Sequence, residues 1–150
     1  MVFARLASEL DSEDIFLWRN DPMTRDSFFN SSKISWEEHI DWFKQKLISP
    51  SSKIIILEHD KNKIGVVRYD KEDSFYLVSI NTNPAHRGKG LSSEMLIYSE
   101  NLIDKGIEPV NLKANILKEN LISKRTFIKA GYEFLREEDT FLCYTKSLQG

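Results

Sequence analysis

The feature of this sequence that most constrains its fold is a predicted strand that runs through a glycine-rich turn into a predicted helix. Residues 75–82 are rich in β-branched and aromatic side chains, which is typical of a strand. The chain after the turn repeats apolar side chains with the period of one helical face, at Leu91, Met95, Tyr98 and Leu102. A strand joined to a helix in this way predicts a protein that packs helices on a β-sheet.

The turn between this strand and helix has the composition of a phosphate-binding loop. Gly88 and Gly90 permit backbone conformations that are barred to other residues, and the first N–H groups of a helix lack internal partners. Arg87 and Lys89 add positive charge at the same point. The dinucleotide-binding and P-loop patterns are both absent, since Ser93 interrupts the first and no Gly-Lys-Ser/Thr run completes the second. The sequence therefore predicts a pyrophosphate site of another kind.

Residues 87–92 resemble the acyl-CoA motif of the GNAT superfamily of N-acyltransferases, Q/R-x-x-G-x-G/A, with Pro84 placed before it as in the family. The last position differs because Ser92 replaces Gly or Ala, and we expect the small serine to preserve the close approach of the backbone. The resemblance implies that acetyl-CoA binds here. Its expected contacts are Ile80, Thr82, Arg87, Gly88, Lys89, Gly90, Leu91 and Ser92.

A second stretch, residues 120–132, resembles the family pattern N-x-x-A/S-x-x-x-Y/F-x-x-x-G-F/Y. The spacing places Asn120, Ser123 and Phe127 on one helical face. In the family, the asparagine reaches the pantetheine arm or a backbone group beside it, and the small residue lets the cofactor pass. The resemblance therefore adds these three residues to the expected acetyl-CoA site.

The catalytic acid is not at its usual place. The family uses a tyrosine at position 127 to protonate the departing thiolate, whereas Phe127 has no proton to give. Tyr132 is our candidate acid. The alternatives are Tyr98, Tyr144 and a water molecule.

The N-terminal half resembles the branch of GNAT enzymes that acetylates nucleotide-linked amino sugars, including the 4-amino-sugar acetyltransferases of pseudaminic acid biosynthesis. The resemblance rests on Trp-Arg-Asn-Asp-Pro at 18–22 and on residues 29–43. We expect an acceptor site at Arg19, Arg25, Asn30 and His39, where Arg19 either grips a substrate phosphate or pairs with a nearby acid. His39 is also our candidate base, because its ordinary pKa suits physiological pH; the alternative is that it packs between Trp36 and Phe43.

The remaining patterns predict the order β-α-α-β-β-β-α-β-α-β-β. The expected strands are 2–6, 53–58, 63–69, 75–82, 110–116, 132–135 and 141–144, and the expected helices start near 8, at 35, after 91 and at 118. Residues 23–33 are expected to form an aromatic-rich loop. We therefore expect one α/β (α+β) domain of GNAT fold over residues 1–150, with a single mixed, mostly antiparallel sheet flanked by helices on both faces.

Composition limits the classes of partner. The net charge of −2, from 21 Lys and Arg against 23 Asp and Glu, lacks the global basic excess of a nucleic-acid binder. The single cysteine, Cys143, excludes an internal disulfide and lies in an apolar run, so we expect it to be buried. No apolar run approaches the ~20 residues of a membrane span. We expect a cytoplasmic monomer or homodimer without a metal.

These observations predict an N-acetyltransferase that moves the acetyl group of acetyl-CoA to a primary amine by direct transfer in a ternary complex. The resemblance favours a nucleotide-linked 4-amino sugar as the acceptor. Two alternatives stay open at this point: acetylation of a protein N-terminus or a polyamine, and a non-catalytic acyl-CoA-binding module.

Overall fold

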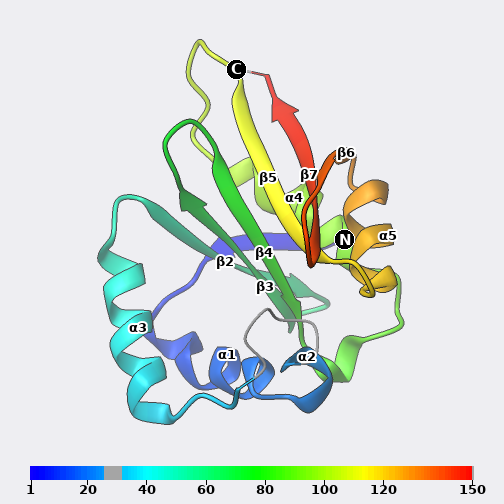
Figure 1. The fold of residues 1–150 in the computed structure, drawn as a ribbon. Coiled ribbons are helices and arrows are strands. Elements are labelled where there is room, and N and C mark those ends of the chain that lie inside the picture. Colours follow the sequence, from blue (N-terminus) through cyan, green and yellow to red (C-terminus); the bar gives the residue numbers. More distant parts are fainter. Residues whose placement is uncertain (26–31, 150) are drawn as a thin grey trace.

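The computed structural model describes residues 1–25 and 32–149, and within them the strands form one mixed sheet in the order β1-β2-β3-β4-β5-β7-β6 (Figure 1). Neighbouring strands are antiparallel except β4 and β5, which run parallel. The strands are β1 Val2–Leu6, β2 Ser52–His59, β3 Asn62–Lys71, β4 Tyr76–Thr82, β5 Val110–Leu117, β6 Glu133–Glu137 and β7 Phe141–Leu148.

The described helices lie on both faces of this sheet. They are α1 Ser12–Arg19, α2 Pro22–Arg25, α3 Trp36–Ile48, α4 Ser92–Ser99 and α5 Leu121–Lys129, with 3-10 turns at Glu9–Asp11, Pro84–His86 and Glu100–Leu102. Because side chains alternate along a strand, β2 sends Ile54 and Ile56 towards α1 and α3, and Ile55 and Leu57 towards α4 and α5. The predicted mixed sheet with helices on both faces is confirmed.

The element boundaries differ from the sequence prediction most clearly in three places. Residues 22–25 form the short helix α2 inside the segment expected to be a loop, because Asp21 accepts the Thr24 N–H and so starts a helical turn. Helix α5 begins at Leu121 rather than at 118, since the Asn120 side chain caps its first turn. The closing hairpin is longer than predicted. The aromatic part of the expected loop lies outside the described residues.

The cores of the two faces contain the apolar side chains that the sequence patterns placed there. On the face of α1 and α3, Trp18 and Phe43 are buried against the sheet. On the opposite face, Met95 and Leu96 of α4 are fully buried. Helix α4 begins directly after the glycine-rich turn, which confirms the helix predicted there. Cys143 is also buried, as expected.

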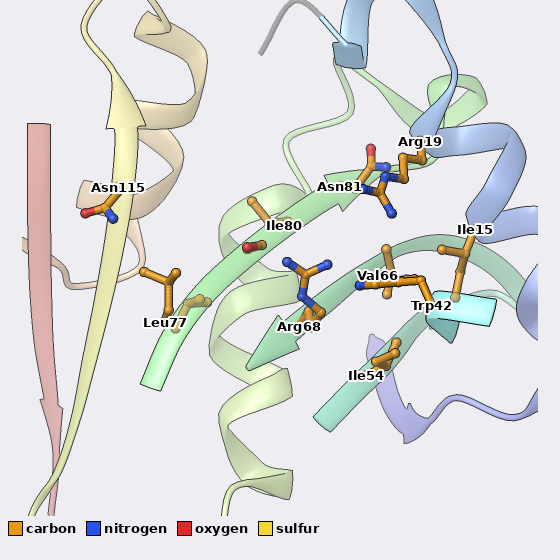
Figure 2. Close-up of a pocket in the computed structure, with 12 residues that line it drawn as sticks. Ile15, Arg19, Trp42, Ile54, Val66, Arg68, Leu77, Ile80, Asn81 and Asn115 are labelled. Atoms are coloured by element: carbon orange, nitrogen blue, oxygen red, sulfur yellow. The ribbon is translucent and has the colours of Figure 1, made fainter. Parts of the chain in front are cut away.

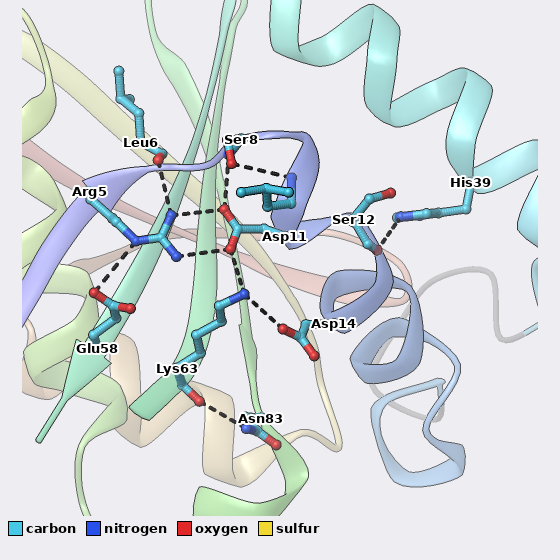
Figure 3. A network of polar contacts seen from close by, with 11 residues as sticks. Arg5, Leu6, Ser8, Asp11, Ser12, Asp14, His39, Glu58, Lys63 and Asn83 are labelled. Atoms are coloured by element: carbon cyan, nitrogen blue, oxygen red, sulfur yellow. Dashed lines mark hydrogen bonds and ion pairs between the residues drawn. The ribbon is translucent and has the colours of Figure 1, made fainter. Parts of the chain in front are cut away.

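A buried carboxylate ties the N-terminal segment to the sheet (Figure 3). Asp11, only 1% exposed, accepts from Arg5 Nη1 at 2.8 Å and Nη2 at 2.9 Å, and pairs with Lys63 Nζ at 2.8 Å. It also accepts from the Ser8 N–H at 2.9 Å, as one half of a capping box that opens the first helical turn. These contacts join β1, the start of α1 and β3, and so fix the position from which α1 crosses the sheet.

Gly65 is the position on β3 where α4 and β4 come closest. A methyl group there would lie 2.7 Å from Asn81 O and 3.1 Å from Thr82 Cα, and would also meet the Met95 side chain. The methionine can move, but the backbone of the neighbouring strand cannot. We expect Gly65→Ala to cost about 2 kcal/mol of unfolding free energy, which lowers the melting temperature by about 4–8 °C in a chain of this size.

Gly106→Ala is the matched control for this measurement by thermal denaturation, because nothing lies within 4 Å of a methyl group there. We expect that variant to melt within about 2 °C of the wild type. Equal melting temperatures for Gly65→Ala and the wild type would show that β4 can move away from β3.

Candidate active site

The centre of the site is a gap in the sheet where β4 and β5 diverge (Figure 1). These two strands pair only at Tyr76 with Leu112 and at Leu77 with Lys113. The β3–β4 pairing continues without a register shift to Thr82, so β4 leaves β5 while still attached to β3. The rest of β4 therefore has one backbone edge without a strand partner.

The direction of the β4 backbone follows from its pairing with β3. The N–H of Asn83 donates to Ile64 O, and alternate residues of an antiparallel pair point their N–H groups to the same side. The N–H groups of Ile80 and Thr82 consequently point into the gap. A donor directed into a gap that two substrates would share can stabilise an oxyanion.

One cavity, of about 620 Å³, opens between the gap, the glycine-rich turn and α5. Its lining includes seven of the residues that the sequence assigned to acetyl-CoA: Ile80, Thr82, Arg87, Gly88, Ser92, Asn120 and Ser123. We call it the cofactor cavity. Lys89, Gly90 and Leu91 lie beside it in the turn, and Phe127 is 3% exposed in the core behind it.

The turn itself has the conformation that the glycines predicted. Gly88 and Gly90 have φ values of 76° and 72°, in the left-handed region, and a methyl group at either would meet nothing within 4 Å. Leu91 occupies the cap position of α4 and its apolar side chain cannot cap the helix. The first N–H groups of α4 are thus uncapped by a side chain and face an open, glycine-lined space, which fits a pyrophosphate.

Arg87 connects this turn to the N-terminal half of the chain. Its Nη2 donates to Asp21 Oδ2 at 2.5 Å and to Thr24 Oγ1 at 2.6 Å. The hydrogen bond from Arg87 lowers the pKa of Asp21 below its ordinary value. A guanidinium has five N–H donors, and within the described residues Nε and Nη1 make no hydrogen bond, so they can bind an anion in the cofactor cavity.

Helix α5 supplies the other wall of the cofactor cavity. Asn120 Oδ1 accepts the Ser123 N–H at 3.1 Å, so its oxygen caps the helix while its Nδ2 is left for other partners. Ser123 faces the cavity with its small side chain, whereas the ring of Phe127 packs edge-on against Tyr132 at 4.9 Å. Of the three residues in the sequence pattern, Asn120 and Ser123 line the cavity, and Phe127 contributes packing instead.

A second cavity, of about 390 Å³, lies on the face of α1 and α3 and meets the first at Ile80 and Asn81 (Figure 2). We call it the acceptor cavity. Its floor follows from strand register, which sets Arg68 opposite Ser79 and Val66 opposite Asn81. Its walls come from Ile15 and Arg19 of α1, Trp42 of α3 and Asn115 of β5.

Two guanidinium groups stand over one indole ring in the acceptor cavity. Arg19 Cζ lies 4.9 Å and Arg68 Cζ 5.0 Å from the centroid of Trp42, within the range of a cation–π contact. Burial and the nearby Arg68 lower the pKa of Arg19. Arg19 Nη1 is buried without a hydrogen-bond partner among the described residues. A buried donor without a partner is costly, and a ligand acceptor atom would satisfy it.

His39 lies in the core and not in the acceptor cavity. It is 0% exposed, its Nε2 lies 2.9 Å from Ser12 O, and its ring stacks on Phe43 at 5.6 Å. Burial lowers the pKa of the His39 imidazole. This is the packing alternative that the sequence left open, and the ring lines neither cavity.

Tyr132 is likewise enclosed in the core, because it is 2% exposed and packs against Phe127. Burial raises the pKa of the Tyr132 hydroxyl, which lines neither cavity. Of the other acceptor-site candidates, Arg25 ends α2 outside both cavity linings, and Asn30 falls outside the described residues.

Four side chains that shape the site were not among the predicted site residues: Trp42, Arg68, Asn81 and Asp21. The first three come together only through packing and register. The sequence does contain a hint of this cavity, because Arg68, Ser79 and Asn81 are polar residues within otherwise apolar parts of β3 and β4. In the described part of the chain, no cluster of His, Cys, Asp or Glu has the arrangement of a metal site. No described helix is long and apolar enough to span a membrane.

The comparisons with known proteins agree with this geometry. Residues 2–133 match the acetyltransferase (GNAT) domain family. The fold is similar to an acetyltransferase from Thermus thermophilus, with a TM-score of 0.79 and 15% identity over 99% of this chain and 97% of that one. Comparison of the sequence with curated proteins gives no match.

Two further structures of similar fold are complexes with CoA or acetyl coenzyme A. The spermidine N-acetyltransferase from Vibrio cholerae, in complex with CoA and spermine, has a TM-score of 0.77 and 16% identity over 98% of this chain and 94% of that one. The Campylobacter jejuni N-acetyltransferase PseH, in complex with acetyl coenzyme A, has a TM-score of 0.70 and 19% identity over 97% of this chain and 98% of that one.

Proposed function

Because this chain belongs to the GNAT acetyltransferase family, an acetyl-CoA-dependent group of N-acetyltransferases, we propose that its acceptor is a nucleotide-linked 4-amino sugar. The observation that carries the proposal is the acceptor cavity, whose lining holds two guanidinium groups and, within the described residues, no carboxylate. Such a cavity attracts an anionic substrate. A nucleotide-linked amino sugar combines phosphate groups with the primary amine that the reaction requires.

The two cavities supply the arrangement that direct transfer needs. They meet at Ile80 and Asn81, so an amine in the acceptor cavity and a thioester in the cofactor cavity would approach each other at the gap in the sheet. Holding two reactants in this way removes much of the entropic barrier to their reaction. Acetyl-CoA supplies the activated acetyl group, and the N–H groups of Ile80 and Thr82 would stabilise the oxygen of its carbonyl.

Proton transfer is assigned to water rather than to a side chain. His39 and Tyr132 are buried away from both cavities, and the titratable groups in the two described linings are the arginines Arg19, Arg68 and Arg87. Arginine stays protonated at working pH and cannot act as a base. A sugar amine is less basic than a lysine side chain and is partly neutral near pH 7, so it can react without a dedicated base.

The experiment that tests the proposal measures release of CoA thiol from acetyl-CoA with a panel of acceptors: UDP-linked 4-amino sugars, spermidine and N-terminal peptides. We expect turnover with the sugar nucleotides. Turnover confined to spermidine or peptides would refute the acceptor while leaving the family unaffected. CoA binding without release of thiol from any acceptor would support the non-catalytic alternative, for which the absence of a tyrosine at Phe127 is the main argument.

We expect Arg19→Ala to raise KM for the sugar-nucleotide acceptor about tenfold, the effect of losing one charge-assisted hydrogen bond. KM for acetyl-CoA should change less than about twofold, because Arg19 lines only the acceptor cavity. Steady-state kinetics with each substrate varied in turn separates the two constants. A rise in KM for acetyl-CoA alone would show that Arg19 serves the cofactor instead.

A further inference from the structure

The acceptor cavity contains a second cation, Arg68 of β3, whose role no sequence motif indicates (Figure 2). We propose that Arg68 and Arg19 together bind a diphosphate group, so that Arg68 selects acceptors carried on a nucleoside diphosphate over those with one phosphate or none. The inference rests on the proposed function, which supplies an anionic acceptor, and adds the form of the anion and the residue that distinguishes it.

Arg68 is held in place from the side opposite the cavity. Its Nε donates to Asp70 Oδ2 at 2.7 Å, and the other oxygen of Asp70 accepts from Ser52 Oγ at 2.7 Å and Lys46 Nζ at 3.0 Å. The carboxylate is therefore shared among three donors and is itself fixed. The guanidinium of Arg68 is oriented before any ligand arrives, which lowers the entropic cost of binding.

The part of Arg68 that faces the cavity is available to a ligand. Its two Nη groups make no hydrogen bond within the described residues, and its side chain is 31% exposed. The paired N–H groups of a guanidinium match two phosphate oxygens in a planar, bidentate contact. Arg19, on the other wall, contributes the buried Nη1 that lacks a described partner.

The cavity lining itself holds two positive groups and, among the described residues, no carboxylate. Arg19 and Arg68 lie close enough for Arg68 to help lower the pKa of Arg19, an effect that Glu38, outside the lining, opposes. Asp70 lies outside the lining and is shared with Lys46. Two linked phosphates offer more oxygens than one, so a diphosphate can make a bidentate contact with each guanidinium at the same time.

The ring of Trp42 is a common contact that keeps the two groups close to each other. Arg19 Cζ of α1 lies 4.9 Å and Arg68 Cζ of β3 lies 5.0 Å from the ring centroid. Both are cation–π contacts, so the indole holds the two side chains on either side of the boundary between α1 and β3. Trp42 is positioned by α3, independently of the strand that carries Arg68. The pair of cations is thus a built arrangement and not two mobile surface side chains.

The test uses probes that bind without reacting. Protein saturated with CoA, which fills the pyrophosphate-binding turn, is titrated calorimetrically with UDP, UMP and uridine, and then with ADP and AMP to separate the diphosphate from the base. We expect each diphosphate to bind at least about tenfold more tightly than its monophosphate, and Arg68→Gln to remove most of that difference. Arg68→Lys keeps the charge but lacks the planar guanidinium, so this variant should retain only part of the difference in affinity between diphosphate and monophosphate.

Arg136→Gln is the matched control, since Arg136 lies on β6 and pairs with Glu138 outside both cavities. That variant should bind the probes as the wild type does. Equal affinity for diphosphate and monophosphate in the wild type, no binding of either diphosphate, or an equal loss for both in Arg68→Gln would each overturn the proposal.

The outcome is separable from that of the proposed function. Diphosphate selectivity without turnover of any amino sugar nucleotide would leave the Arg68 site standing and refute the acceptor. Turnover of such a sugar, together with an unchanged preference of Arg68→Gln for diphosphate over monophosphate, would support the acceptor and refute the Arg68 site. A purely structural role for Arg68 would lower the melting temperature without changing the ratio of the two affinities.

Discussion

Replacing Asp11 by alanine is expected to lower the free energy of unfolding by about 3 kcal/mol, because it leaves Arg5 and Lys63 beside a buried site without their common partner. In a chain of this length the melting temperature should fall by about 6–12 °C. The Ser8 N–H also loses its acceptor, so the first turn before α1 loses one half of its capping box. Thermal and urea denaturation would measure the change.

Asp104→Ala is the control for this measurement. Asp104 also pairs with a lysine, Lys53, but its side chain is 92% exposed, and exposed pairs contribute less than about 1 kcal/mol. A similar small effect for Asp11→Ala would mean that Arg5 and Lys63 find other partners, such as Glu58.

The same carboxylate gives the stability a defined pH dependence. Burial alone raises the pKa of Asp11, but the hydrogen bonds from Arg5 and Lys63 outweigh it and lower the pKa well below its ordinary value. A depressed pKa in the folded state means that the stabilisation is present above the unfolded value, about 3.9, and is lost as pH falls towards the folded one. The stability difference between wild type and Asp11→Asn should therefore shrink below about pH 4.

Replacing Arg87 by alanine is expected to raise KM for acetyl-CoA about 100-fold. Arg87 is the cation that lines the cofactor cavity at the pyrophosphate-binding turn, and a guanidinium that makes several charge-assisted bonds contributes about 3 kcal/mol. KM for the acceptor should change much less, although Asp21 and Thr24 lose their contact with the turn. Steady-state kinetics and direct CoA binding by calorimetry would both report the loss.

Lys89→Ala provides the comparison, because Lys89 lies in the same turn but its Nζ is 3.4 Å from His86 Nδ1 and outside the cavity lining. We expect its effect to be about threefold, that of a nearby but indirect charge. If Arg87→Ala left the affinity for acetyl-CoA unchanged, the assignment of this turn to the cofactor would be wrong.

The parts of the molecule that the sequence predicts are those encoded by local patterns. The apolar run of β2 and the period of α4 are properties of neighbouring residues, and both elements appear in the structure as expected. The turn at Gly88 and Gly90 is local in the same sense, since its positive φ angles follow from residue type. The residues that these patterns single out for acetyl-CoA include seven that line one cavity, and their contact with the cofactor stays a prediction.

The acceptor half depends on contacts between distant segments, which a local pattern cannot encode. Arg68 reaches Trp42 only because β3 and α3 pack on each other, and Arg87 meets Asp21 across 66 positions of sequence. His39 has the residue type of a catalytic base, but its helix turns it into the core. The residue type alone does not tell whether a side chain binds substrate or packs in the core, because its burial and its contact partners decide which of the two it does.

The short contact between β4 and β5 divides the sheet into a four-stranded part, β1 to β4, and a three-stranded part, β5 to β7, joined through two residue pairs of these fully described strands. Few main-chain hydrogen bonds therefore cross the sheet at that seam, and the two parts are held together by the apolar core beneath it, which Leu57, Met95 and Leu112 share. The seam runs beside both cavities. The sheet is thus open at the place where two bulky reactants must enter and two products must leave, while the core below keeps its two parts together.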